Sequence, residues 1–301
     1  QIAPGILDIH KGDVQVMALV NLKQLVTDAS RRGYAVGSFN VVNMETLQAI
    51  LQAAEENRSP VILSVAEAHF PFIDLEEFSP IILRAARKAT VPVAVHLDHG
   101  QSFSAIIKAL RNGFTSVMFD GSTLPLEENI FKTREISRIA HAINVSVEAE
   151  LGHVTGGEGD ASPGVADPSL FTNPQEARLF VTETGIDALA VAIGSVHGIY
   201  RGTPQLDIPR LAKTRKLTGV PLVLHGGSGL SDDDFREAIA NGIAKVNVYT
   251  DMSQAAMAKI RTVDTLPETL GFPEFMVQVR EAIKEAVTEK MRVFGSVGRS
   301  N

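Results

Sequence analysis

The stretch VPVAVHLDHG, residues 91–100, decides the fold. It is almost continuously apolar until it breaks into polar residues and a glycine, which is typical of a strand buried on both faces of a parallel sheet. The stretches DALAVAIGSVHG, residues 187–198, and VPLVLHGGSG, residues 220–229, repeat this arrangement. Each is a hydrophobic run that leads into a histidine followed by glycine. The repetition predicts parallel strands that carry histidines at their carboxyl ends.

Strands of this kind alternate with amphipathic helical segments along the chain. The alternation predicts an α/β fold, a (β/α)8 TIM barrel that closes after Val248 and carries additional C-terminal helices. We expect a single catalytic domain over residues 1–301, with residues 1–16 as an extension and residues 274–301 as a C-terminal helical extension. The predicted strands span residues 34–40, 61–65, 93–98, 115–120, 145–151, 188–194, 221–227 and 244–250.

Composition excludes several classes of protein. The chain has 301 residues, 45% of them hydrophobic, which is enough for a substantial core. Its net charge of −7, without a basic run, argues against a nucleic-acid partner. No apolar stretch is long enough to span a membrane, and the N-terminus lacks the pattern of a signal peptide. The absence of cysteine excludes disulfides, and we expect a cytoplasmic protein.

Three histidines at predicted strand ends indicate a metal site. His99, His197 and His225 follow the third, sixth and seventh predicted strands, and residues at these ends meet at one face of a barrel. Without cysteine, imidazole and carboxylate must hold any zinc ion, and three imidazoles leave a fourth position for substrate. The remaining histidines outside these strands are predicted to be structural or solvated: His10, His69, His141 and His153.

Carboxylates also lie at or near the ends of the predicted strands. Asp98 directly precedes the first of the three histidines and either orients it or acts as a general acid/base, and the residues alone leave both roles open. Asp120 ends the fourth predicted strand, and the fifth contributes Glu148 and Glu150. His96 has the same strand parity as Asp98, which favours a place in the pocket or behind it.

A glycine-rich turn follows the seventh predicted strand. The residues Gly226-Gly227-Ser228-Gly229 lead into a helix that begins near Ser231, and backbone amides in such a turn bind phosphate. Alone, this motif is more typical of a tight turn. Beside His225, and with Asn247 and Thr250 at the next strand end, it predicts a phosphate site.

Five segments taken together resemble the class II, zinc-dependent ketose-bisphosphate aldolases of the fructose- and tagatose-bisphosphate type. The resemblance runs from about residue 22 to residue 298. It implies a TIM barrel, a homodimer or homotetramer, a zinc ion and often a monovalent cation. It also implies reversible aldol cleavage of a ketose phosphate to dihydroxyacetone phosphate and an aldehyde. The segments are HLDHG, VEAELGHVTGGEGD, AVAIGSVHGIY, LVLHGGSGLS and GIAKVNVYTD.

The resemblance implies a role for each matching residue. His99, His197 and His225 match zinc ligands, and Asp98 matches the catalytic acid/base. Asp120 and Glu150 match carboxylates near the metal that engage it in an alternative position. Positions that bind the substrate phosphate are matched by Gly198, Gly226, Ser228, Asn247 and Thr250.

Four positions depart from the family pattern. The loop GGEGD has Gly159 where relatives carry an acidic residue implicated in proton transfer, and Glu158 is expected to replace it. Tyr249 stands where fructose-bisphosphate aldolases often have aspartate, and Arg201 where some relatives have lysine. Glu274 replaces an arginine that reaches the distal phosphate. We therefore expect a ketose 1-phosphate, or an unusual bisphosphate, to be preferred.

Two other functions remain open from the sequence. A zinc hydrolase on the same barrel would use Asp98 to activate a metal-bound water. A barrel without catalysis would bind a sugar phosphate as a sensor. The product distinguishes these functions, because only an aldolase releases dihydroxyacetone phosphate.

Overall fold

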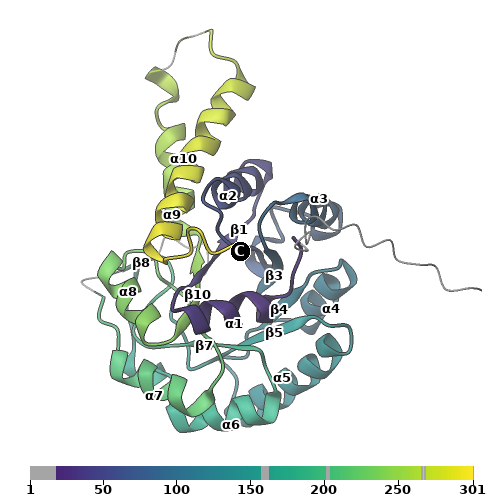
Figure 1. Cartoon of the computed structure of the whole chain (residues 1–301), viewed down its shortest axis with the longest axis vertical. Coiled ribbons are helices and arrows are strands. Elements are labelled where there is room, and N and C mark those ends of the chain that lie inside the picture. The colour runs from purple at the N-terminus through teal and green to yellow at the C-terminus, as the bar shows by residue number, and fades with distance from the viewer. Residues whose placement is uncertain (1–17, 157–162, 201–203, 266, 268, 301) are drawn as a thin grey trace, which may run out of the picture.

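The computed structural model describes residues 18–156, 163–200, 204–265, 267 and 269–300. These residues contain a closed barrel of parallel strands in the order β1-β10-β9-β7-β5-β4-β3-β2 (Figure 1). The predicted TIM barrel is confirmed, and each predicted strand corresponds to a barrel strand. The barrel strands are β1 (Val36–Asn40), β2 (Val61–Ala66), β3 (Val93–Gly100), β4 (Ser116–Phe119), β5 (Ser146–Leu151), β7 (Ala188–Val191), β9 (Leu222–Leu224) and β10 (Ile243–Val248).

Helices follow the barrel strands and form the outer layer (Figure 1). Local sequence explains their ends: Ser231 forms a capping box with Asp234, and Gly185 ends its helix in the left-handed conformation with φ +67°. The helices are α2 (Met44–Glu56), α3 (Leu75–Lys88), α4 (Phe103–Arg111), α5 (Leu126–His141), α6 (Pro174–Thr184), α7 (Ile208–Thr218), α8 (Asp232–Ala240), α9 (Thr250–Ile260) and α10 (Phe272–Val293), with short 3-10 turns η1 (Glu67–His69), η2 (Pro168–Leu170) and η3 (Val263–Thr265).

Helix α1 (Leu22–Arg32) lies across the N-terminal end of the barrel (Figure 1). Its buried side chains pack against the first inward-facing residues of the strands, and we call this apolar cluster the barrel floor. Because α1 covers this end, the C-terminal strand ends form the open mouth. The floor consists of Leu22, Leu25, Val26, Ala29, Tyr34, Val36, Ile62, Ala94, Met118, Ala188, Ala190, Val223 and Ala244.

Polar residues fill the barrel interior above this floor. Two residues beyond Ala94 lies His96, and His96 faces Glu148 of β5 and Lys245 of β10 across the barrel. Since residues two apart in a strand point to the same side, the inner face changes from apolar to charged within one step. The sequence predicted nearly continuous apolar strands, so this polar layer is a departure from that expectation.

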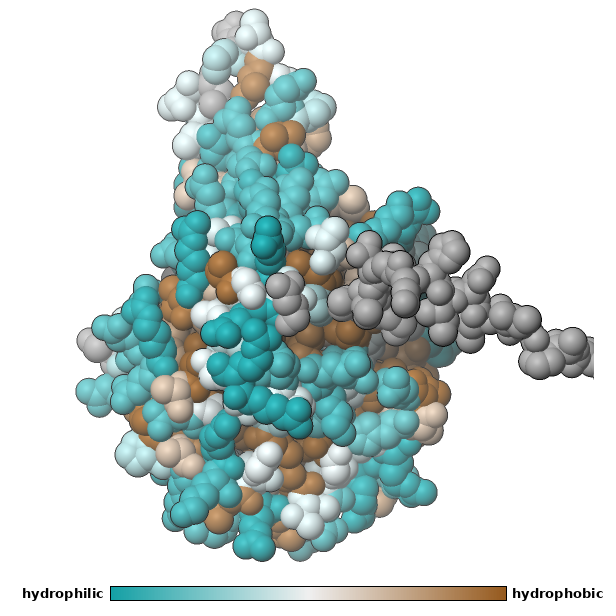
Figure 2. Space-filling model, in the orientation of Figure 1, coloured by the Kyte–Doolittle hydropathy of each residue, from teal (hydrophilic) through white to brown (hydrophobic). Residues whose placement is uncertain are grey.

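Helices α9 and α10 form a hairpin that projects from the barrel (Figure 1). The predicted C-terminal helices are therefore present, and α10 begins at Phe272. Helix α10 also packs against α2 of the barrel. Figure 2 shows hydrophobic patches among the mostly hydrophilic surface of this hairpin. The exposed apolar side chains here include Met257, Val263 and Val277, and Phe272 is 76% exposed.

A small parallel sheet joins the long loop after β5 to the segment after β7. Strand β6 (Pro163–Gly164) pairs with β8 (Ile199–Tyr200). Three predictions fall outside the described residues: the extension at residues 1–16 with His10, the loop acid Glu158, and Arg201. Among the helices that the structure describes, none is long and apolar enough to cross a bilayer.

Candidate metal centre and active site

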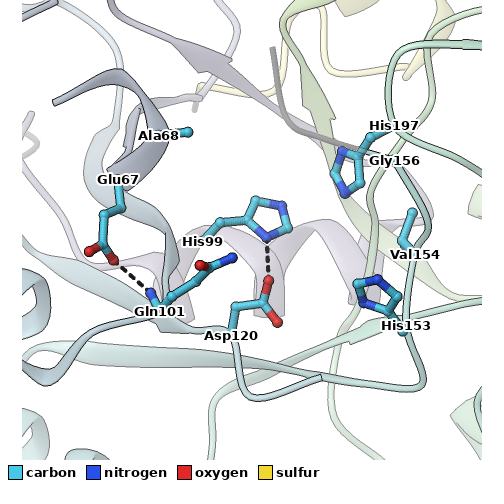
Figure 3. A pocket seen from close by; sticks show the side chains of 9 residues that line it. All are labelled: Glu67, Ala68, His99, Gln101, Asp120, His153, Val154, Gly156 and His197. Atoms are coloured by element: carbon cyan, nitrogen blue, oxygen red, sulfur yellow. Dashed lines mark hydrogen bonds and ion pairs between the residues drawn. The ribbon is translucent and has the colours of Figure 1, made fainter. Parts of the chain in front are cut away.

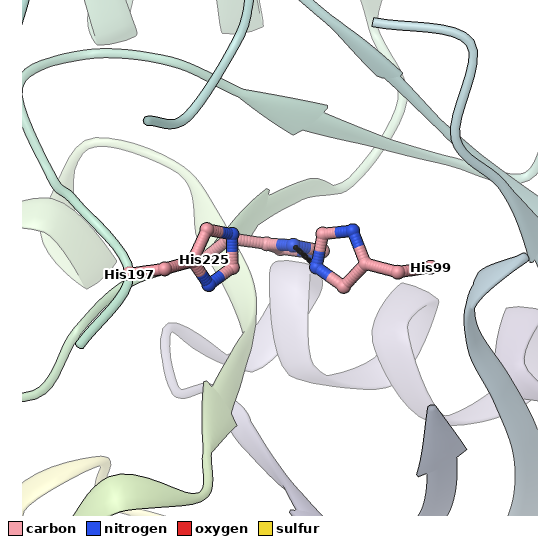
Figure 4. Close-up of side chains that lie close together, drawn as sticks. All are labelled: His99, His197 and His225. Atoms are coloured by element: carbon pink, nitrogen blue, oxygen red, sulfur yellow. Dashed lines mark hydrogen bonds between the residues drawn. The ribbon is translucent and has the colours of Figure 1, made fainter. Parts of the chain in front are cut away.

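The barrel brings His99, His197 and His225 together at its mouth (Figure 4). One nitrogen atom from each ring lies within 4.8 Å of the others, so the three side chains could hold one metal ion. His99 belongs to the end of β3, and the other two follow β7 and β9. All three are buried. His99 has a φ of +44°, a strained backbone conformation for a residue with a side chain, which is common at functional sites.

Carboxylates fix the ring nitrogens that face away from this centre. His99 Nδ1 donates to Asp120 Oδ2 over 2.8 Å, and His225 Nε2 donates to Glu148 Oε1 over 3.0 Å. With these tautomers, the facing atoms His99 Nε2 and His225 Nδ1 both carry lone pairs, and they are 2.7 Å apart. At this distance either a proton or a metal ion has to lie between the two nitrogens. The donor set therefore fits a metal that binds neutral imidazole.

Burial favours the neutral form of His197 and His225. It lowers the pKa of His197 well below the usual histidine value, and the neighbouring His99 and His225 lower it further. The pKa of His225 is lowered by burial and by His99, although Glu148 opposes the shift. A neutral imidazole binds a metal without first losing a proton.

A buried ion pair supports His225 from below. Lys245 is 0% exposed, and its Nζ lies 2.9 and 2.8 Å from the two carboxylate oxygens of Glu148. Burial alone would raise the pKa of Glu148, but Lys245 and the hydrogen bond from His225 lower it to about 2. Burial and the Lys245 charge lower the pKa of His96 to about 3. Glu148 is therefore ionised, while His96 is neutral.

A second group of possible ligands shares His99. Its atoms come from His99, Asp120 and Glu150. Burial and the nearby Asp120 charge raise the pKa of Glu150 to about 8. Burial also acts to raise the pKa of Asp120, but the hydrogen bonds from His99 and Ser122 lower it below its usual range. The two predicted metal-side carboxylates thus lie beside the histidine centre, one charged and one protonated near neutral pH.

Asp98 lies next to the histidines with its carboxylate buried. Asn247 Nδ2 donates to both of its oxygens, over 2.9 and 3.1 Å. Burial opposes ionisation of Asp98, but the charges of His99 and Lys245 lower its pKa well below the usual value. An ionised, oriented carboxylate at this place can accept a proton from a bound ligand.

The glycine-rich turn borders a small hollow beside the metal centre. Helix α8 cannot offer its first amides there, because its N-terminus is closed by the capping box of Ser231. Helix α9 begins at Thr250, and its N-cap residue Tyr249 makes no side-chain capping bond, so α9 is the helix whose N-terminal dipole faces the hollow. The lining residues are His197, Gly198, Gly226, Gly227, Ser228, Asn247, Tyr249 and Thr250.

A larger cavity of about 350 Å³ opens on the other side of the histidines (Figure 3). His153 from the long loop lies in it, and Ser122 links His153 Nδ1 (2.9 Å) to Asp120 Oδ1 (2.6 Å). Glu67 accepts the backbone amide of Gln101 and thereby fixes the loop after β3. The lining residues are Glu67, Ala68, His99, Gln101, Asp120, His153, Val154, Gly156 and His197.

Comparison with known proteins agrees with this geometry. The family model for class-II fructose-bisphosphate aldolase matches residues 20–299. The chain belongs to the class II fructose-bisphosphate aldolase family. It is therefore an enzyme, a carbon–carbon lyase of the aldolase class.

Relatives of this class II aldolase match it over nearly their whole length. A probable fructose-bisphosphate aldolase of Bacillus subtilis is 45% identical, and the alignment covers 93% of this chain and 99% of the relative. The fructose-bisphosphate aldolase of Thermus caldophilus is 43% identical, with 94% and 100% covered. The crystal structure of the YdjI aldolase from Escherichia coli K12 superposes with a TM-score of 0.85 at 40% identity, with 94% and 100% covered.

The sequence reasoning did not assign three polar residues that lie in or near this centre. His153 lines the cavity, and His69 is buried near Asp98, which agrees with its prediction as structural or solvated. Lys245 had a usable signal, because a lysine within a strand predicted to be buried needs a charged partner. The sequence around His69 offers no such clue, because no glycine follows it as one follows the three histidines at the strand ends.

Proposed function

We propose that this class II aldolase reversibly cleaves a ketose phosphate into dihydroxyacetone phosphate and an aldehyde, with Zn²⁺ bound by His99, His197 and His225. The observation that carries the proposal is the meeting of three buried imidazoles beside the buried carboxylate of Asp98. Imidazole is a preferred zinc ligand, and three of them leave a coordination position for substrate oxygen.

Asp98 acts as the base in the proposed cleavage. It accepts the proton of the substrate C4 hydroxyl, the C3–C4 bond breaks, and the aldehyde leaves. The two bonds from Asn247 hold its oxygens in place for this transfer. Bound zinc would supply Lewis acidity, which polarises the ketose carbonyl and stabilises the charge that develops on the three-carbon half. Glu158, on the loop outside the described residues, is the proposed donor that returns a proton to C3.

The phosphate of the three-carbon half occupies the hollow at the start of α9 in this proposal. The uncapped helix end and the amides of the glycine turn favour an anion there. Ser228 offers a hydroxyl within the same turn. The proposed phosphate-binding residues are Gly198, Gly226, Gly227, Ser228, Asn247 and Thr250.

A ketose 1-phosphate is the proposed substrate. Glu274 is exposed in the first turn of α10, on the projecting hairpin. In an assembly where this turn reaches the mouth of another copy, as the resemblance implies for the matching arginine, Glu274 would repel a second phosphate. Tyr249 borders the phosphate hollow. We expect kcat/KM for a ketose 1-phosphate to exceed that for fructose 1,6-bisphosphate. A strong preference for the bisphosphate would refute this choice of substrate.

A homodimer or homotetramer is the proposed assembly. The exposed apolar side chains of the α9–α10 hairpin, Phe272 and Val263 among them, would be covered by another copy of the chain. Light scattering coupled to gel filtration measures the mass, and a monomer at micromolar concentration would exclude this assembly.

The proposed reaction is tested by its product. Purified enzyme with Zn²⁺ should release dihydroxyacetone phosphate from a panel of ketose phosphates, and a chelator should abolish this until zinc is restored. Asp98→Asn should lower kcat by at least about 100-fold, because general base catalysis contributes roughly that much, while zinc binding persists. Release of inorganic phosphate instead of dihydroxyacetone phosphate would indicate a hydrolase.

A further inference from the structure

We propose that His69 binds a hydroxyl group on the aldehyde half of the substrate and thereby selects hydroxylated aldehydes. His69 is the last residue of η1, directly after β2 at the barrel mouth. Its exposed fraction is 4%. Both of its ring nitrogens are buried and have no hydrogen-bond partner among the described residues.

Such a side chain calls for a ligand. A buried polar atom without a partner is costly, and nearly all buried polar groups in folded proteins are satisfied. His69 leaves two such atoms on one ring, whereas the neighbouring His96 and His225 have partners at their nitrogens. A molecule bound at the mouth would supply the missing hydrogen bonds once the side chains that cover these nitrogens make way for it.

The ring is held in position by Tyr249. The two ring centroids are 4.6 Å apart, with 47° between the planes. Tyr249 follows β10, and β1 lies between β10 and β2 in the barrel, so the pair spans the end of β1. Tyr249 also borders the phosphate hollow. His69 therefore lies beyond this tyrosine as seen from the hollow, on the side of the mouth where β3 presents Asp98.

The protonation state of His69 indicates which kind of group it would bind. Burial lowers the pKa of His69, and the Asp98 carboxylate opposes the shift only in part, so the ring is neutral. A neutral imidazole has one N–H donor and one acceptor nitrogen. A hydroxyl group matches both, because it also donates and accepts, whereas a phosphate or carboxylate offers acceptors only and would lie close to the Asp98 charge.

The position along the substrate follows from the proposed function, on which this inference rests. If the phosphate lies in the hollow and Asp98 takes the proton from the C4 hydroxyl, the chain of the ketose continues past Asp98. The next carbon, C5, is then the one whose hydroxyl reaches His69. This carbon is the α-carbon of the released aldehyde.

The test uses two aldehydes that differ in this hydroxyl alone. The enzyme is assayed for condensation of dihydroxyacetone phosphate with glycolaldehyde and with acetaldehyde. His69→Phe keeps an aromatic ring against Tyr249 but removes both nitrogens. We expect it to lower kcat/KM for glycolaldehyde about 10-fold, the effect of one to two lost hydrogen bonds, and to leave acetaldehyde within about 2-fold. His69→Gln, which retains a donor and an acceptor, should recover part of the loss.

Two controls separate folding and basic chemistry from this inference. Proton exchange at C3 of dihydroxyacetone phosphate needs no aldehyde, so it should be equal in the wild type and in His69→Phe. His141→Phe, on the outer surface, should leave both aldehydes unchanged. An equal loss for both aldehydes, or no loss for either, would overturn the role of His69 while exchange persists. Absence of exchange in the wild type would overturn the proposed function and this inference together.

Discussion

Lys245 is a fully buried cation in the middle of a barrel strand, and Glu148 makes that position tolerable. Its ammonium meets both oxygens of this carboxylate, which also accepts the Nε2–H of His225 and lies 3.7 Å from His96 Nε2. Replacing a buried pair by apolar residues often costs little, so such a pair is weak evidence for a stabilising role. Its value here lies in keeping Glu148 ionised and therefore in fixing which nitrogen of His225 faces the proposed metal site.

Removal of this cation should affect both stability and metal binding. Lys245→Met leaves the Glu148 charge buried and unpaired, so we expect the free energy of unfolding to fall by about 3–5 kcal/mol. Zinc affinity should fall about 10- to 100-fold, as for other lost partners of ligating histidines. Urea unfolding and competition with a chromophoric chelator measure the two effects.

A double variant distinguishes these effects. Lys245→Met combined with Glu148→Gln leaves no unpaired charge, so most of the stability should return while zinc affinity stays low. If the single variant bound zinc as tightly as the wild type, Lys245 would have no part in orienting His225.

The loops that carry two of the proposed metal ligands are packed against each other. Gly226 has a φ of +66°, and a Cβ atom there would lie 2.3 Å from the carbonyl oxygen of Val196, which precedes His197. The turn after β9 and the segment after β7 therefore have to move together. We expect a side chain at Gly226 to push the backbone at Val196 and His197 away from the turn and so to disturb the spacing of His197 and His225.

Gly219 provides a matched control for this contact. It has a φ of +70°, but a Cβ atom there meets no atom of the described residues within 4 Å. Gly219→Ala should cost only the backbone strain of a left-handed alanine, about 1–2 kcal/mol. Gly226→Ala should cost the same strain and, in addition, weaken zinc binding by at least about 10-fold. Calorimetric unfolding and zinc titration of both variants test this, and equal zinc affinities would show that the loops are not coupled.

Helix α10 supports the phosphate turn from the side of the hairpin. Lys290 Nζ lies 3.1 Å from Asp251 Oδ1, and the other oxygen of Asp251 accepts the Ser228 hydroxyl. Without the lysine, the Asp251 charge would face an incoming phosphate unopposed. Phe235 of α8 packs between α10 and the glycine-rich turn. Its ring contacts the Lys290 ammonium on one side and lies against Gly227 on the other.

Loss of Lys290 should therefore raise KM more than it lowers kcat. We expect Lys290→Met to raise KM for the phosphorylated ketose on the order of 3- to 10-fold, or about 1 kcal/mol of binding. Lys284→Met is the control, because Lys284 lies on the same helix but pairs with Glu56 and Glu281 instead. Asp251→Asn added to Lys290→Met should restore KM, and a failure to do so would argue for a merely structural lysine.

At the scale of the whole molecule, the sequence predicts the barrel and the meeting of the histidines. Hydrophobic runs of strand length mark each barrel strand, and parallel strands necessarily place their carboxyl ends at one mouth. His99, His197 and His225 could therefore be assigned to one centre although more than 120 residues separate the first from the last.

Contacts across the barrel interior could not be predicted in the same way. Glu148 and Lys245 are 97 residues apart, and their pairing depends on the stagger of β5 against β10 rather than on either local sequence. His69 lies in a single 3-10 turn whose direction is set by packing on Tyr249. Hydrophobic periodicity carries information on which face a residue takes, but not on which distant residue it meets.

The separation of the barrel floor from the mouth affects how this enzyme can acquire new substrates during evolution. The apolar residues of the floor and the residues of the mouth occupy opposite ends of the same strands. Substitutions around His69 and Tyr249 leave that floor intact, so new side chains there can sample other aldehydes while the chain still folds. Tolerance to mutation should accordingly be higher at the mouth than at the floor. The proposed metal ligands at the mouth are the exception, because their substitution would remove the metal site.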